Sequence, residues 1–78
     1  MSISGEREVL KAAEESGEGV WEQEMKAPGR AKDLVYRLTV FRARVQLEPE
    51  DYDDDLRRRL REWEWRARGK RVILTRIQ

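Results

Sequence analysis

The stretch PEDYDDDLRRRLREWEWRARG, residues Pro49 to Gly69, decides the fold expected for this chain of 78 residues. Proline suits the first turn of a helix, because its φ is fixed and its missing N–H would be unpaired there. Acidic residues come first and basic residues last, which is the order that the helix macrodipole favours. Gly69 fits the left-handed position that follows many helices. These signals predict one main helix over residues 49–68.

Apolar residues recur within this stretch at helical spacing. A stripe about 80° wide on a helix would hold five of them: Tyr52, Leu56, Leu60, Trp63 and Ala67. Acid-before-base pairs four residues apart would each add about 0.2–0.5 kcal/mol to helix stability. They are Asp53–Arg57, Asp54–Arg58, Asp55–Arg59, Glu62–Arg66 and Glu64–Arg68. Burial of the apolar stripe must therefore dominate the stability of this helix.

Trp65 does not belong to the stripe. At 100° per residue it lies on the opposite side of the predicted helix, among Arg57, Arg58, Arg61 and Arg68. One interpretation is that the ring lies over arginine stems and gains a cation–π interaction of about 0.5–1 kcal/mol. The other is that a further surface covers it: the N-terminal helix, a second copy of the chain, or a ligand.

Length and composition predict a single small domain, residues 1–78, without a cofactor or a metal. The chain has no cysteine and no histidine, so disulfides and the usual zinc ligand sets are absent. Acid–base and nucleophilic catalysis lack their commonest side chains, and there is no glycine-rich phosphate loop. The aspartates at positions 51 and 53–55 lack the glycine and the distant glutamate of a calcium loop. We therefore expect a protein that is not an enzyme.

A short chain with a small core needs further stabilisation, and charge networks or a homodimer would supply it. No basic, apolar signal pattern opens the sequence, and no apolar run approaches the ~18 residues of a membrane span. We expect a cytoplasmic protein with no membrane contact and no small-molecule substrate.

The N-terminal third predicts a short helix and a strand. Ser4 is a suitable N-cap, Val9, Leu10 and Ala13 form a thin apolar side, and Gly17 with Gly19 ends the helix. Weak alternation over residues 20–25 predicts a strand that buries Trp21 and Met25. Residues 26–33, KAPGRAKD, predict an exposed turn.

Residues 34–47 are rich in β-branched and aromatic residues, which favours a strand. The apolar residues change face at Val40–Phe41, which indicates a β-bulge at that point. A helix stays open as the alternative, because Leu34, Leu38, Phe41 and Val45 also fit a period of 3.6.

Residues 71–77 are apolar on both faces and predict an interior strand. A strand–helix–strand unit with tight connections predicts a right-handed parallel crossover. The expected fold is therefore α+β with the order α-β-β-α-β: a three-stranded mixed sheet with the helix of residues 49–68 packed on it.

The favoured functional hypothesis is a protein-interaction module that binds a partner or a second copy of itself. Tryptophan and arginine are the residues most enriched among interface hot spots. The expected partner-binding residues share the outer face of the main helix: Arg57, Arg58, Arg61, Trp65 and Arg68. Acidic residues in segments 1–25 and 48–55 supply complementary charge for a second copy.

Nucleic-acid binding is the alternative. The basic segment 57–71 would contact phosphates, aided by Arg42, Arg44, Lys70 and Arg71, while Trp65 stacks on a base. Against this hypothesis, most of these arginines have an acid close by, and the isoelectric point of about 8.1 is below that of most basic nucleic-acid-binding domains.

Overall fold

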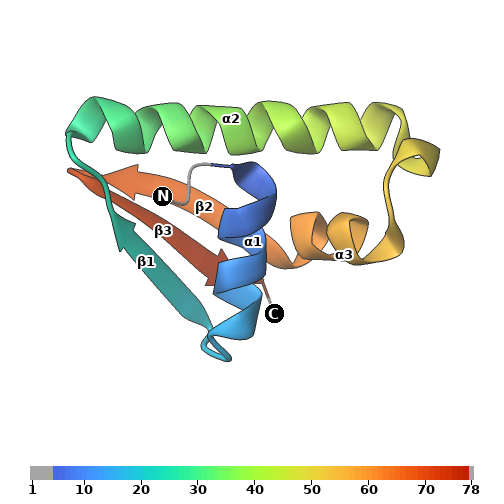
Figure 1. Ribbon diagram of the computed structural model, residues 1–78, viewed down its shortest axis with the longest axis horizontal. Helices are drawn as coiled ribbons and strands as arrows, with labels where there is room; N and C mark the ends of the chain where they lie inside the picture. The colour runs from blue at the N-terminus through green and yellow to red at the C-terminus, as the bar shows by residue number, and fades with distance from the viewer. Residues whose placement is uncertain (1–4, 78) are drawn as a thin grey trace.

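The computed structural model of the protein describes residues 5–77 and shows an α+β fold, as predicted (Figure 1). The described residues form three α-helices, one 3-10 helix and a three-stranded sheet. In chain order the elements are α1 (Glu6–Glu15), β1 (Val20–Glu24), α2 (Pro28–Leu47), η1 (Pro49–Asp51), α3 (Asp54–Glu62), β2 (Trp63–Arg68) and β3 (Arg71–Arg76).

The sheet has the order β1-β3-β2, and both neighbouring pairs are antiparallel. The central place of β3 confirms the prediction of an interior strand, but the predicted mixed sheet with a parallel crossover is wrong. The reason is a tight hairpin: Arg68 pairs with Arg71, so that Gly69 and Lys70 alone connect β2 to β3. Gly69 has a φ of 60°, which glycine adopts at little cost. Its left-handed conformation was predicted, but it follows a strand and not a helix.

The predicted helix over residues 49–68 is wrong beyond Glu62. Helix α3 starts after Asp53, whose side chain accepts a hydrogen bond of 2.8 Å from the backbone N–H of Leu56. From Trp63 onward apolar and charged residues alternate with a period of two, and β2 buries the apolar set against the helices. Two of the predicted charge pairs span residues of β2, where positions four apart are about 13 Å from each other. The small energy of such pairs does not compete with burial of a tryptophan.

The strand predicted over residues 34–47 is also wrong, and the helical alternative is confirmed. Helix α2 begins at Pro28, inside the segment expected to be a turn. Leu34, Leu38 and Val45 are buried, and Phe41 packs against the core half-buried. These are the residues that fitted a helical period in the sequence. Apolar residues on the opposite side of α2 hid that period by making the segment apolar on two faces.

All three helices lie on one face of the sheet (Figure 1). The core between the two layers consists of Val9, Leu10, Ala13, Ala31, Leu34, Leu38, Val45, Leu56, Leu60, Trp63, Val72 and Leu74. Helix α1 ends as predicted, with Gly17 at a φ of 73°. Its predicted N-cap, Ser4, lies outside the described residues. Trp21 and Met25, which were predicted to be buried, are half-buried against the core, and β1 ends at Glu24, before Met25.

The opposite face of the sheet has no helix on it among residues 5–77. Its outer strands differ in charge: β1 presents Glu22 and Glu24, and β2 presents Arg66 and Arg68. Ile73 lies between Glu22 and Arg66 in the strand register and is only 7% exposed.

Neither a membrane-spanning helix nor a metal-binding cluster is found among residues 5–77. No helix of residues 5–77 combines the length and the apolar character needed to cross a bilayer. In those residues no group of three or more His, Cys, Asp or Glu side chains is arranged to hold a metal ion.

Candidate functional site

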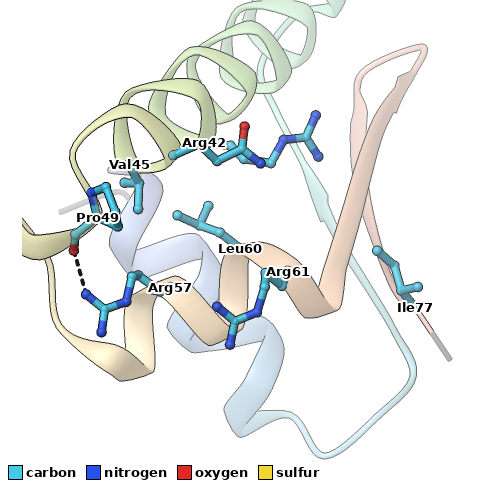
Figure 2. Close-up of a pocket in the computed structure, with 8 residues that line it drawn as sticks. Arg42, Val45, Pro49, Arg57, Leu60, Arg61 and Ile77 are labelled. Carbon is cyan, nitrogen blue, oxygen red and sulfur yellow. Dashed lines mark hydrogen bonds between the residues drawn. The ribbon is translucent and has the colours of Figure 1, made fainter.

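A pocket of about 480 Å³ opens between the C-terminal half of α2 and helix α3 (Figure 2). Three basic side chains, four apolar ones and one amide line it together: Arg42, Val45, Gln46, Pro49, Arg57, Leu60, Arg61 and Ile77. Val45 and Leu60 are buried members of the core, so the pocket has an apolar floor beneath its charged rim. Pockets of this size accept small ligands or single side chains of a partner.

Arg57 is fixed in place by the chain around it. Its guanidinium donates to the carbonyl oxygens of Pro49 and Tyr52, the latter at 2.8 Å, and pairs with the carboxylate of Asp54. These contacts satisfy the carbonyl groups of the turn between α2 and α3. Arg57 therefore shapes the wall of the pocket, with part of its charge already neutralised.

Arg42 connects the pocket to Trp65. The carbon at the centre of its guanidinium lies 4.7 Å from the centroid of the Trp65 ring. The indole Nε1 of Trp65 donates a 3.0 Å hydrogen bond to Thr39 Oγ1, also on α2. The ring is thus half-buried between β2 and α2, and the prediction that Trp65 points away from the sheet layer is wrong. The prediction was wrong because Trp63 and Trp65 belong to a strand, in which residues two apart lie on the same face, and not to a helix.

Arg61 is the exposed arginine of the rim, and within residues 5–77 no carboxylate pairs with it. Figure 2 shows it extending from α3 on the same side as Arg57, next to Leu60. An unpaired guanidinium beside an apolar floor can form a bidentate contact with a carboxylate that arrives from outside.

Arg58 was predicted to belong to the same binding face, but it lies in an internal charge network. It donates to both carboxylate oxygens of Glu14 at 2.8 and 2.9 Å and to Glu62 at 3.0 Å. Arg59 also donates to Glu14, at 3.2 Å. The hydrogen bonds from Arg58 and Arg59 lower the pKa of Glu14 to about 2, and Glu14 in turn raises the pKa of Arg58. Arg58 therefore joins α1 to α3.

The remaining predicted residues lie away from the pocket. Arg68 ends β2, about 16 Å along the strand from α3, and Lys70 lies in the turn after it. Arg71 pairs with Glu22 at 3.5 Å and Glu24 at 3.9 Å. Arg44 is exposed on the outer side of α2. The residues predicted to share one helix face therefore do not form one surface. Two of them, Arg57 and Arg61, line the pocket together with Arg42.

Sequence reasoning missed the apolar part of the site, Val45, Leu60 and Ile77. The helical alternative for residues 34–47 held the signal, because Arg42, Val45 and Gln46 share one side of a helix at spacings of three and four. Only the strand assignment separated them.

The chain matches no protein-family model, no curated protein and no solved structure.

Proposed function

We propose that this protein is a non-enzymatic interaction module that binds an acidic segment of another protein in the pocket between α2 and α3. The observation that supports this function is the meeting of Arg42, Arg57 and Arg61 around an apolar floor. Arginine anchors beside a small apolar pocket are typical of the energetically important centre of protein interfaces.

Charge supports an acidic partner. Arg61 and Arg42 have no carboxylate within ion-pair distance among the described residues, whereas Arg57 holds the pocket wall. Among residues 5–77, the side chains that line the pocket include no acidic one. A carboxylate from a partner would meet the unpaired guanidinium of Arg61 and little repulsion, which favours both fast association and specificity.

The apolar floor of the pocket favours a partner that carries an aliphatic side chain next to its carboxylates. Leu60 and Val45 form its base, and Ile77, which is 45% exposed, adds an apolar edge. A leucine or isoleucine side chain placed there would be removed from water and would also cover Ile77. Burial of apolar surface contributes about 25 cal/mol of binding free energy per Å².

The contacts of the half-buried Trp65 make stacking on a nucleobase less favourable than this peptide contact. Arg42 covers the indole ring, and Thr39 accepts its N–H. The other predicted phosphate-binding residues, Arg68, Lys70 and Arg71, lie at the far end of the β2–β3 hairpin. A nucleic-acid surface would need them in one stripe with an open aromatic face.

Isothermal titration with a short peptide that carries one leucine between pairs of glutamates tests this function. We expect measurable binding at low salt and at least a fivefold weaker affinity for the Arg61→Ala variant. Arg68→Ala is the matched control, because it removes an exposed arginine far from the pocket and should leave the affinity unchanged.

Two reference ligands complete the experiment: the same peptide with lysines in place of its glutamates, and a mixed-sequence single-stranded oligonucleotide. Equal binding of the acidic and basic peptides would overturn the proposal. Binding of the oligonucleotide alone, weakened by Arg68→Ala and falling log-linearly with salt, would replace it with the nucleic-acid function.

A further inference from the structure

Strand β1 forms one edge of the sheet, with β3 on one side of it and no strand on the other (Figure 1). Two backbone hydrogen bonds fix which of its residues face β3. Met25 N–H donates to the carbonyl oxygen of Lys70 at 2.7 Å, and Arg76 N–H donates to the carbonyl oxygen of Gly19 at 2.8 Å. In an antiparallel pair such hydrogen-bonded positions recur at every second residue. The N–H and C=O groups that point away from β3 therefore belong to Val20, Glu22 and Glu24.

These outward backbone groups have no backbone partner among residues 5–77. An open strand edge of this kind presents a row of donors and acceptors to which an extended chain can add. In such a complex the main-chain hydrogen bonds supply affinity, and the alternating side chains decide which chain binds. The side chains beside the edge therefore indicate the kind of partner.

On the sheet face without helices, two of the three side chains along this edge are acidic. The carboxylates of Glu22 and Glu24 share a single guanidinium, that of Arg71, at 3.5 and 3.9 Å. They remain 47% and 68% exposed. One guanidinium does not neutralise two carboxylates, so the edge keeps a negative charge. Opposite charges on neighbouring strands stabilise the pairing of those strands.

The helix side of the same edge is partly apolar. Trp21 lies there half-buried against the core, and Gln23 is half-buried beside it. A strand added to β1 would cover the exposed part of the Trp21 ring if its residues on that side were apolar. The edge therefore fits a chain in which basic and apolar residues alternate.

We propose that the free edge of β1 binds an extended basic segment of another protein as a fourth strand, antiparallel to β1. Lysine or arginine side chains at alternate positions would lie opposite Glu22 and Glu24, and apolar residues between them would cover Trp21. The antiparallel direction gives slightly more stable pairing per residue than the parallel one. This surface shares no residue with the pocket between α2 and α3.

The same charges disfavour a second copy of this chain as the occupant. In the antiparallel register that pairs all three free residues, Glu22 of one copy would lie directly opposite Glu22 of the other. Like charges directly opposite each other destabilise a strand pair. Acidic side chains on this edge therefore oppose self-pairing and favour a basic strand.

Isothermal titration with a capped peptide of alternating lysine and valine tests the site. We expect measurable binding at low salt and at least fivefold weaker affinity for Glu22→Lys. Glu50→Lys is the matched control, because it makes the same charge change at an exposed position in η1, far from β1, and should leave the affinity unchanged (Figure 1). Absence of binding, or equal affinities of the two variants, would overturn the proposal.

Two altered peptides separate strand addition from simple charge attraction. In the antiparallel pair the N–H groups of the lysines opposite Glu22 and Glu24 point toward β1, and those of the valines point away. N-methylation of the lysines should therefore abolish binding, and N-methylation of the valines should leave it unchanged. Equal effects of the two modifications, or loss of binding on valine methylation alone, would contradict an antiparallel fourth strand.

The leucine peptide with paired lysines is a further control, because it carries charge on both of its faces. It would place a lysine beside Trp21, so it should bind this edge at least fivefold more weakly than the alternating peptide. Light scattering tests the remaining occupant. A mass that rises with protein concentration in wild type but not in Glu22→Lys would assign the edge to a second copy and overturn the proposal. None of these results depends on acidic-peptide binding in the α2–α3 pocket.

Discussion

Glu14 shows how a single surface residue can connect two elements. It lies on α1, and its carboxylate accepts hydrogen bonds from Arg58 and Arg59 of α3. Arg58 continues the network to Glu62, which Arg76 of β3 also contacts at 3.3 Å. A bidentate arginine contact fixes both side chains, so this network specifies how α1 docks as well as stabilising it.

Glu14→Gln should lower the free energy of unfolding by about 1–2 kcal/mol at pH 7, because charge-assisted hydrogen bonds are lost. In a domain of this size that corresponds to a Tm about 5–15 °C lower. The neighbouring Glu15→Gln is the control, since Glu15 is exposed and makes no ion pair within the described residues. Thermal unfolding followed by circular dichroism measures both, and equal Tm values for the two variants would contradict the role of Glu14.

The same residue predicts a pH dependence. The folded protein lowers the Glu14 pKa from 4.5 to about 2, so the unfolded chain takes up this proton at a higher pH than the folded one. The stability that Glu14 contributes is complete above pH 4.5 and is lost as the pH falls toward 2. The difference in unfolding free energy between wild type and Glu14→Gln should therefore shrink over that range in urea titrations. A constant difference would show that the ionised carboxylate is not responsible.

The elements differ in how clearly the sequence predicts them. Helix α1, strand β1 and the central strand β3 each have one apolar pattern that fits one structure. Helix α2 has apolar residues on two opposite faces, and this pattern also fits a strand with a β-bulge. The segment from Trp63 to Arg68 fits both periods, because its alternating residues also continue the helical spacing of Leu56 and Leu60. Burial in the folded protein decides whether such a segment becomes a helix or a strand. The local sequence pattern does not show which of its residues will be buried.

The hairpin between β2 and β3 depends on Gly69. Gly69→Ala should destabilise the protein by about 1 kcal/mol, because a side chain is strained at a φ of 60° although nothing lies within 4 Å of the added carbon. Gly29→Ala is the matched control: it also meets nothing within 4 Å but lies in the first turn of α2, where alanine is neutral or slightly stabilising. Urea unfolding of both variants checks this, and equal stabilities would rule out a strained turn.

At the scale of the molecule, residues 5–77 form two layers, with their helices on one face of an antiparallel sheet (Figure 1). Its candidate site could be predicted only in part. The arginines are evident in the sequence, but their meeting with Val45 and Ile77 depends on how α2 and α3 are placed around the pocket. Charge patterns identify candidate residues, whereas long-range packing decides which of them share a pocket.

The two faces of α2 should respond very differently to the same truncation. Leu38→Ala removes a fully buried side chain and should cost about 2–4 kcal/mol, enough to unfold much of a domain this small. Leu47→Ala removes one that is 82% exposed and should change stability by less than about 0.5 kcal/mol at low protein concentration. Equal effects in a denaturant titration would mean that α2 is rotated on the sheet.

Charge reversal at Arg61 tests the proposed function most directly, because this side chain is exposed and its replacement should leave the fold intact. The measurement is the affinity of the wild type and of Arg61→Glu for the leucine peptide with glutamate flanks and for its counterpart with lysine flanks. We predict that wild type prefers the acidic peptide and that Arg61→Glu loses this preference or inverts it. An unchanged preference in a variant that remains folded would contradict binding in the pocket between α2 and α3.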